Sequence, residues 1–307
     1  MFLEWKVETE EDGLLLRTFL KSKHISKQLL TAVKFGAEGK IEVNNEEQNV
    51  LYHVKAGDKV RLTFPTEQQN ERLLAEYTDL DIIFEDDFLL IINKPAGMAS
   101  IPSQYHPNGS VANFVKGHYE TQGLTNAIHI VTRLDRETSG LMLIAKNRFA
   151  HARLSTFLQK GLLKRRYQAF TSGVLVEQKG SIEAPIGRKE VSIMERFVTP
   201  EGKYAKTNYE VLARYRAFDH VAIQLETGRT HQIRVHFSYI GHPLIGDDMY
   251  GGDTNLLKRQ ALHSCHLHLV HPLTEKYMAF DLPLPADMEE IITKIEVIRV
   301  LKSYLVM

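Results

Sequence analysis

The residue with the clearest chemical potential is Asp135, which lies between Arg133 and Arg136. A short Thr-Ser-Gly turn follows, and then an apolar run, 141–145, that predicts a buried strand. Cations on either side can keep an aspartate at such a strand–loop junction ionised and direct it into a cleft. The alternative is that Asp135 only accepts hydrogen bonds from the backbone of the turn. On local chemistry alone, this structural role is the more common of the two.

A second group of cations lies around a predicted helix, with Arg229 in the turn before the helix and Arg234 near its start. Thr230 can cap this helix and Gly241 can end it. Apolar residues at helical spacing should face the core: Ile233, Phe237 and Ile240. Another face carries His231, Arg234 and Ser238. Either arginine can pair with Asp135 or with a phosphate, and the alternative for each is a surface ion pair of little energetic value.

Two segments carry basic residues and no acid. The first contains Arg17, Lys21, Lys23, Lys27 and Lys34, and the second contains Lys146, Arg148, Arg153, Lys160, Lys164, Arg165 and Arg166. Acidic residues are concentrated between them, at 67–87. The chain has 38 basic and 38 acidic residues, so its net charge alone does not indicate a nucleic-acid binder. The segregation favours phosphate contact over ordinary solubilising helix faces.

Length and composition are typical of a soluble enzyme of about two domains, with 307 residues. No apolar run approaches the roughly 18 residues that a membrane helix needs. The N-terminal residues lack the layout of a signal peptide. The single cysteine, Cys265, excludes an intramolecular disulfide and is typical of a reducing compartment. We therefore expect a cytoplasmic protein without a membrane partner. A monomer is the expected state, and the sequence leaves the oligomeric state open.

The acidic, polar stretch 66–79 predicts a linker between two domains, because it has no apolar period. Residues 1–65 before it predict a small module of two short helices followed by strands. Ser26 should open the second helix, and Gly36 should close it. The strands are expected near 41–45 and 54–62.

The remaining residues, 80–307, predict the catalytic domain. Strands are expected at 81–84 and 88–93, and helices should begin after Ser110 and Asn147. Strands with inserted helices, in place of regular βαβ repeats, indicate an α+β fold. We expect a mixed, largely antiparallel sheet with flanking helices.

An ordered set of segments in this domain resembles the signatures of the RluA-type pseudouridine synthases. The run around Asp135, Arg-Leu-Asp-Arg-Glu-Thr-Ser-Gly, is similar to the signature that carries the catalytic aspartate of that family. Further similar segments are Asn93–Met98, Arg165–Ala169, Leu225–His236, His271–Thr274 and Leu282–Pro285. They occur in the expected order between about residues 80 and 287. Residues 1–65 resemble the α-L RNA-binding module that many members carry at their N-terminus.

The resemblance implies that the chain converts uridine to pseudouridine in structured RNA, with Asp135 as the catalytic residue. It favours Arg234 as the partner of Asp135, and it places Tyr167 where its ring can stack on the uracil. Reaching a base inside folded RNA requires extrusion of the nucleotide. Arg133, beside the aspartate, can then fill the gap and hold a phosphate. The other residues expected to bind RNA are Arg229, Arg17, Lys21, Lys23 and Lys27.

The reaction breaks the bond from ribose to the ring nitrogen and rejoins the ribose through carbon 5. No redox change occurs and no atom is lost, so we expect neither a cofactor nor a metal. Asp135 can attack the anomeric carbon or remove a ribose proton to give a glycal, and the sequence leaves both routes open. Either route passes through positive charge on the sugar, which a carboxylate stabilises.

Alternatives to this function remain. A non-catalytic RNA-binding or ribosome-assembly factor could retain the fold, although it would be expected to lose Asp135. A glycoside or nucleoside hydrolase normally needs two carboxylates at a set separation, and only one acid has that context here. The sequence leaves open which uridine is modified and whether ribosomal or transfer RNA is the substrate.

Two further features bear on the site. Thr132 stands where the family usually has histidine, directly before the Arg-Leu-Asp run, so the role of that histidine has no counterpart here. Four histidines near the single cysteine superficially suggest a metal site: His263, His266, His268 and His271. Their spacing is not that of known zinc sites, and alternation along a strand should distribute them over both of its faces.

Overall fold

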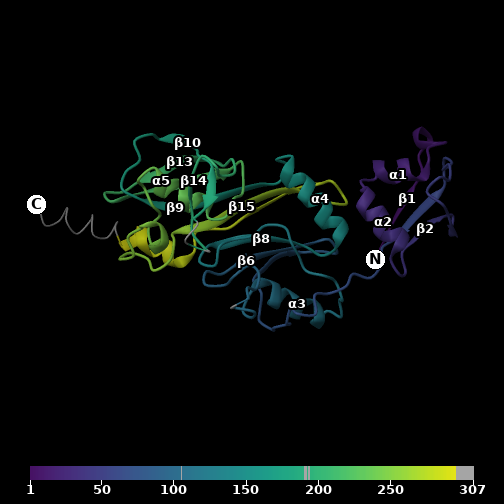
Figure 1. Cartoon of the computed structure of the whole chain (residues 1–307), viewed down its shortest axis with the longest axis horizontal. Coiled ribbons are helices and arrows are strands. Elements are labelled where there is room, and N and C mark those ends of the chain that lie inside the picture. The colour runs from purple at the N-terminus through teal and green to yellow at the C-terminus, as the bar shows by residue number, and fades with distance from the viewer. Residues whose placement is uncertain (105, 190–191, 193, 295–307) are drawn as a thin grey trace, which may run out of the picture.

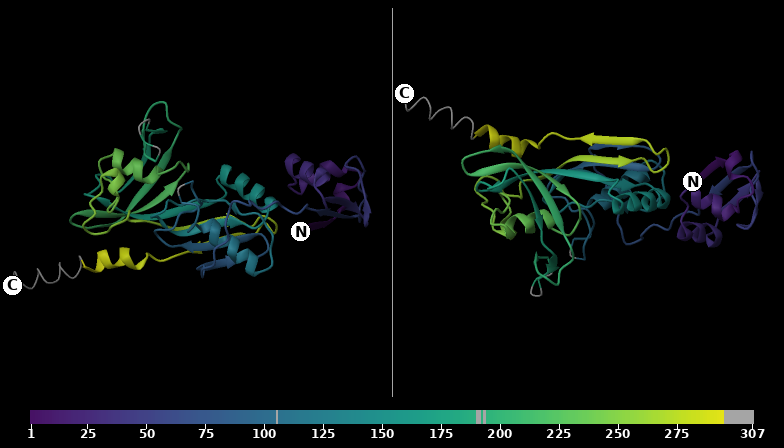
Figure 2. Two further views of the ribbon diagram at one scale, coloured as in Figure 1. Left: turned by 60° about the horizontal axis from the view of Figure 1, so that its bottom comes forward. Right: turned by 90° about the horizontal axis from the view of Figure 1, so that it is seen from above.

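Two β-sheets, each with its own apolar core, organise the computed structural model, which describes residues 1–104, 106–189, 192 and 194–294. The smaller sheet belongs to the N-terminal residues and the larger to the rest of the chain (Figure 1). Figure 2 shows the smaller unit at one end of the molecule, beside α4 (Arg148–Gln159). The last stretch of the predicted catalytic domain, 295–307, lies outside the described residues.

The N-terminal unit has four antiparallel strands in the order β1-β4-β2-β3. Its elements are β1 (Phe2–Lys6), η1 (Thr9–Glu11), α1 (Leu16–Ser22), α2 (Lys27–Phe35), β2 (Lys40–Val43), β3 (Glu46–Glu47) and β4 (Lys59–Thr63). The predicted limits of the second helix are confirmed. The hydroxyl of Ser26 accepts a hydrogen bond from the backbone N–H of Leu29, and Gly36 is the C-cap. The first strand was missed because its burial alternates over only five residues.

One buried cluster holds this unit together, built from α1, α2 and the inner positions of the strands. Phe149 of α4 belongs to the same cluster, with its ring 6.2 Å from that of Phe64 and 6.3 Å from that of Phe88. An aromatic contact therefore joins the N-terminal unit to the larger sheet.

The segment between the two sheets lies against the larger unit. The Glu67 carboxylate lies 2.5 Å from the His129 imidazole and accepts a hydrogen bond from the backbone N–H of Arg148. Leu73 is buried, and its carbonyl oxygen accepts from Lys116. Although the segment is polar and has no apolar period, these single contacts attach it to the larger unit.

The larger sheet follows the order β10-β13-β14-β9-β15-β8-β6-β5, with β16 on β15 and β7 on β8. All of its pairs are antiparallel except β8 with β15, which confirms the predicted α+β fold with a mixed, largely antiparallel sheet. The strands are β5 (Ile82–Glu85), β6 (Leu89–Lys94), β7 (His129–Ile130), β8 (Ser139–Ala145), β9 (Lys164–Ser172), β10 (Lys179–Glu183), β13 (Lys206–Arg214), β14 (Phe218–Leu225), β15 (Leu262–Val270) and β16 (Tyr277–Asp281). A separate hairpin pairs β11 (Ile186–Arg188) with β12 (Arg196–Val198).

Helices cover both faces of this sheet. Alternate side chains of β6 and β8 enter two different clusters, because successive residues of a strand point to opposite faces. α3 (Val111–Thr121) and α5 (Gln232–Tyr239) pack in one cluster, and α4 packs in the other. Figure 1 shows α3 and α4 on opposite sides of β6 and β8. The hydroxyl of Ser110 and the amide oxygen of Asn147 accept the expected N-cap hydrogen bonds of α3 and α4.

None of the helices in the described part of the chain is long and apolar enough to cross a membrane.

Candidate active site

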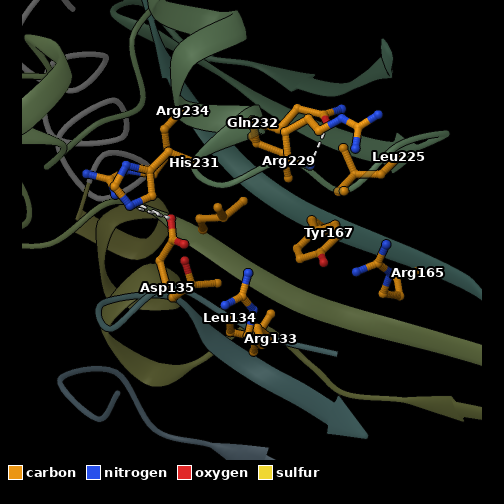
Figure 3. Close-up of a pocket in the computed structure, with 14 residues that line it drawn as sticks. Arg133, Leu134, Asp135, Arg165, Tyr167, Leu225, Arg229, His231, Gln232 and Arg234 are labelled. Carbon is orange, nitrogen blue, oxygen red and sulfur yellow. Dashed lines mark hydrogen bonds and ion pairs between the residues drawn. The ribbon is translucent and has the colours of Figure 1, made fainter. Parts of the chain in front are cut away.

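A small cavity of about 70 Å³ lies where the loop before β8, the middle of β9 and the start of α5 meet. A larger groove of about 710 Å³ adjoins it. The cavity and the groove share Arg133, Asp135, Arg165 and Arg229 in their walls. Figure 3 shows Asp135 beside Arg234 and His231 at one side of the cavity, with Tyr167 and Arg165 at the other.

The loop that carries Asp135 is held through its backbone by three buried polar side chains. Ser100 donates to the carbonyl oxygen of Leu134 at 2.7 Å and accepts from the N–H of Leu134 at 3.0 Å. Lys94 donates to the carbonyl oxygen of Arg136 at 3.0 Å, and Arg259 donates to that of Glu137 at 3.2 Å. None of these three residues was assigned a role from the sequence, because their partners are distant along the chain. The only indication for Lys94 was that it lies in Asn93–Met98, one of the segments that resemble the family's signatures.

Gly140 fixes the end of this loop on the sheet. Its φ is +109°, a conformation that residues with a Cβ rarely adopt, and a Cβ there would collide with the backbone of Ser264. The parallel pairing of β8 with β15 starts at this contact. The close approach of the two strands sets where the Asp135 loop leaves the sheet.

Arg234 joins Asp135 to a second, deeply buried carboxylate. Its Nη1 donates to Oδ2 of Asp135 at 3.3 Å, and its Nε and Nη2 donate to the two oxygens of Asp247, each at 2.7 Å. Arg234 is 5% exposed and Asp247 is 0% exposed. Burial alone would lower the pKa of Arg234, but the hydrogen bonds and charge of Asp247, followed by those of Asp135, raise it. The guanidinium therefore stays charged and is held in one orientation by a bidentate pair.

The sequence predicted that Thr230 caps α5, and this prediction was wrong. The N-cap is His231, in the left-handed conformation with φ +57°, and its side chain makes no capping hydrogen bond. Gln232 instead organises the turn, since its side-chain oxygen accepts from the hydroxyl of Thr227 and from the N–H of Arg229. The side chain of Gln232 therefore stabilises the start of α5 in place of an N-cap side chain.

The remaining predicted residues of the site line the cavity at different depths. Tyr167, on β9, is 4% exposed and belongs to the apolar cluster beneath the cavity. Arg133 is exposed at the mouth. The side chain of Arg165 packs beside Gly228. Arg229 is exposed, and its Nε donates to the carbonyl oxygen of Tyr204 at 2.9 Å. Together they form a cationic rim around a deeper carboxylate and ring.

The basic residues of the N-terminal unit do not reach the cavity. Arg17 and Lys21 on α1 and Lys27 on α2 are exposed. Lys23 differs from them, because its ammonium lies 2.7 Å from the Glu11 carboxylate and over the Phe19 ring. The sequence did not predict this ion pair, because Glu11 lies just before the basic segment, which has no acid of its own.

The second basic segment is only partly available for phosphate contact, because three of its seven cations lie close to acids from other parts of the chain. Lys146 pairs with Glu85 at 2.7 Å, and Arg153 pairs with Glu275 at 2.6 Å. Arg148 lies 3.7 Å from Glu67. These acids come from β5, from the turn between β15 and β16, and from the linker. Four residues of this segment have no ion pair within the described part of the chain: Lys160, Lys164, Arg165 and Arg166.

Two other sequence features have structural roles. Thr132 is buried, and its hydroxyl accepts a hydrogen bond from the N–H of Leu143 at 2.9 Å, which fixes the start of the Asp135 loop against β8. Three of the four histidines near Cys265 have separate partners: His263 contacts Ser139, His266 contacts Asp281, and His271 contacts Asp86. His271 lies beyond the end of β15, and the register of β15 against β9 shifts between Ser264 and His266, so simple alternation does not describe these positions.

The arrangement suits attack on, or stabilisation of, an electron-poor carbon. A carboxylate fixed by a buried arginine lies across a small cavity from an aromatic ring. Cations line the entrance, where an anionic polymer can bind.

Comparison with known proteins agrees with this geometry. The family described as RNA pseudouridylate synthase matches residues 88–239. An RNA pseudouridine synthase of Bacillus subtilis, described as uncharacterized, is 52% identical over 268 residues, which cover 87% of this chain and 94% of that protein. The ribosomal large subunit pseudouridine synthase D of Pseudomonas aeruginosa is 39% identical over 264 residues, covering 81% of this chain and 82% of that protein. Among solved structures, human RNA pseudouridylate synthase domain containing 4 superposes with a TM-score of 0.56 at 21% identity, covering 70% of this chain and 92% of that one.

Proposed function

Because the chain belongs to the RNA pseudouridine synthases, a family of isomerases, we propose that Asp135 is its catalytic residue and that ribosomal RNA is its substrate. The observation that carries the role of Asp135 is the asymmetry of its two oxygens. Oδ2 accepts from Arg234, whereas no hydrogen bond to Oδ1 is found among the described residues. Oδ1 is therefore the oxygen available for reaction.

The proposed reaction begins with a uridine turned out of the RNA into the cavity, its ring on the face of Tyr167. Oδ1 either attacks carbon 1 of the ribose or takes the proton from carbon 2. The bond from ribose to ring nitrogen 1 breaks, the uracil turns, and carbon 5 bonds to the ribose. Carbon 5 loses its proton, nitrogen 1 gains one, and Asp135 is regenerated, so the atoms balance without a cofactor. Arg234 keeps Asp135 oriented through both steps.

The cationic rim supports RNA as the polymer. Arg133, Arg165 and Arg229 line the cavity and the groove outside it, at positions where they can hold phosphates beside the extruded nucleotide. Arg133 is adjacent in sequence to the catalytic loop and is the residue proposed to enter the gap left by the uridine. The partner is structured RNA, with no membrane involved.

Domain roles follow from the same proposal. Residues 1–65 act as an α-L-type RNA-binding module, 66–79 as the linker, and 80–307 as the catalytic domain. The module binds RNA through Arg17, Lys21, Lys23 and Lys27, of which Lys23 must exchange its contact with Glu11 for a phosphate. Ribosomal RNA is favoured over transfer RNA because the relative from Pseudomonas aeruginosa is named for the large ribosomal subunit. The protein acts in the cytoplasm as a monomer.

Release of tritium to water tests this proposal, because pseudouridine formation replaces the hydrogen on carbon 5 of uridine. Transcripts of bacterial large-subunit ribosomal RNA and of transfer RNAs, each made with 5-tritiated uridine, are incubated with the protein and with Asp135→Asn. We expect release from the ribosomal transcript only, and none with the variant. Release from transfer RNA alone would overturn the substrate, and release by Asp135→Asn would overturn the catalytic residue. Binding of the transcripts without release would favour an RNA-binding or assembly factor.

A further inference from the structure

A second donor faces Asp135 beside Arg234. The Nε2 of His231 lies 3.9 Å from Oδ2 of Asp135, the same oxygen that Arg234 contacts. His231 adopts a left-handed backbone conformation, which is uncommon for residues other than glycine, although histidine, asparagine and aspartate adopt it more often than the rest. Strained positions of this kind persist where the surrounding structure enforces them, and they cluster at functional sites.

The surroundings of His231 select which ring nitrogen carries the proton. The Asp135 carboxylate repels a lone pair and attracts an N–H, so it favours a proton on Nε2. Nδ1 is then an acceptor, and it lies 2.8 Å from the hydroxyl of Tyr250 at the end of η2 (Asp248–Tyr250). The Tyr250 oxygen in turn accepts from the backbone N–H of Arg196 at 3.0 Å.

Tyr250 has a second contact with the same group of residues. Its ring lies under the Arg234 guanidinium, 4.9 Å from ring centroid to Cζ. Burial raises the pKa of the Tyr250 hydroxyl, so the hydroxyl remains a donor near neutral pH. Tyr250 therefore orients both of the side chains that face Oδ2 of Asp135.

We propose that His231 is a positioning residue for the pseudouridine synthase reaction, which in its neutral form presents an N–H to Oδ2 of Asp135 and is held in that form by Tyr250. The inference rests on the proposed catalytic role of Asp135. Arg234 and His231 together hold one carboxylate oxygen, which leaves Oδ1 directed at the sugar. Binding of the nucleotide need only shorten the 3.9 Å separation to complete a hydrogen bond.

Protonation of His231 would disrupt this arrangement. A charged imidazole donates from both nitrogens and no longer accepts from Tyr250, and its charge weakens Asp135 as a nucleophile or base. The charged groups around His231 are Asp135, Arg234, Arg196 and Asp247. Burial lowers the pKa of His231 below its ordinary 6.5, Arg234 and Arg196 act in the same direction, and Asp135 and Asp247 oppose them. The rate should therefore fall on the acid side, below pH 6.5.

Two substitutions separate this role from a purely structural one. His231→Asn keeps a residue that tolerates the left-handed conformation but removes the imidazole. Tyr250→Phe removes the hydroxyl and retains the ring over Arg234. The matched control is Tyr239→Phe, the same change at an exposed tyrosine of α5.

The measurement is the single-turnover rate of tritium release from the 5-tritiated ribosomal transcript at saturating enzyme, from pH 5 to 8. We expect a loss of about 100-fold for His231→Asn and about tenfold for Tyr250→Phe, with RNA affinity unchanged. The acid-side inflection should disappear in His231→Asn. It should move to higher pH in Tyr250→Phe, because the hydroxyl no longer stabilises the neutral imidazole. Tyr239→Phe should match wild type.

A rate loss with an unchanged acid-side inflection would show that His231 is only structural, and wild-type rates would overturn the proposal outright. If His231→Asn fails to fold, the inflection of Tyr250→Phe decides the question. Failure here is distinguishable from failure of the proposed function. Release by Asp135→Asn refutes the role of Asp135, whereas an inactive Asp135→Asn with unaffected His231 and Tyr250 variants refutes only this inference.

Discussion

Charged residues have opposite surroundings in the cleft around Asp135 and in the N-terminal unit. In the cleft, Arg234 and Asp247 are almost wholly removed from solvent and joined by two hydrogen bonds of 2.7 Å. In the N-terminal unit, Arg17, Lys21 and Lys27 are exposed on two short helices. A buried charged side chain with fixed partners determines the positions of its neighbours. An exposed, flexible one contributes to the electrostatic potential of the surface and to the affinity for RNA.

The difference predicts which measurable quantity each region controls. Changes in the cleft should act on the rate of the chemical step and, where a buried pair is broken, on folding stability. Changes in the N-terminal unit should act on RNA affinity and on its dependence on salt, and the rate at saturating enzyme should not change. The predictions below test this separation.

The largest effect is expected for Asp135→Asn. An amide can neither attack the sugar nor take its proton, so the single-turnover rate should fall by at least about a thousand-fold. RNA affinity, measured by filter binding, should stay within about twofold, since the loop is held through its backbone by Lys94, Ser100 and Arg259. Turnover above a few per cent of wild type would remove Asp135 from the mechanism.

Arg234→Ala should affect both rate and stability, because it leaves Asp247 buried without its partner. Breaking a buried ion pair in this way costs about 3–5 kcal/mol, measurable by denaturant unfolding. The matched change at an exposed arginine of the same site, Arg229→Ala, should leave stability unchanged and reduce affinity in a salt-dependent manner. The reverse ranking of the two variants would show that Arg229, and not Arg234, orients Asp135.

Tyr167→Phe should preserve RNA affinity, because the ring face that stacks on the base remains. Among the described residues, no hydrogen bond occupies the Tyr167 hydroxyl, which leaves it available to the substrate. If the hydroxyl carries the carbon 5 proton, we expect the rate to fall by about 100-fold, with an intermediate that accumulates in single-turnover experiments. Near-normal turnover would reduce Tyr167 to a stacking platform.

The smallest effect on rate is expected for the N-terminal unit. Changing Arg17, Lys21 and Lys27 together to glutamine should weaken binding to the ribosomal transcript and flatten its salt dependence, by roughly one unit of slope per phosphate contact. The control changes Lys40, Lys55 and Lys59, three exposed lysines of the same unit outside the helices. Both triple variants lose the same charge. Equal salt slopes for the two would show that the helices have no special contact with RNA.

Local signals in the sequence predicted the elements well. Cap residues such as Ser26, Ser110 and Asn147 gave correct helix starts, because a cap is a hydrogen bond within three residues. Asp135 and its preceding arginine were recognisable because their signature is contiguous. Similar segments across two-thirds of the chain indicated the family, which the relatives confirmed.

What the sequence determined by itself was therefore the helices that begin at a cap residue, several of the strands, the family and the residues of contiguous signatures. The resemblance had already favoured Arg234, 99 residues away, as the partner of Asp135, but only the tertiary structure showed that the same guanidinium also binds the buried carboxylate of Asp247. The same holds for Ser100, which clamps a loop 34 residues away. The periodicity of apolar residues indicates which side chains are buried, and cap residues indicate hydrogen bonds within a few residues. The distances between side chains far apart in the sequence depend on the order of the strands in the sheet. Only the parallel contact of β8 with β15, together with the packing of α5, brings these side chains together.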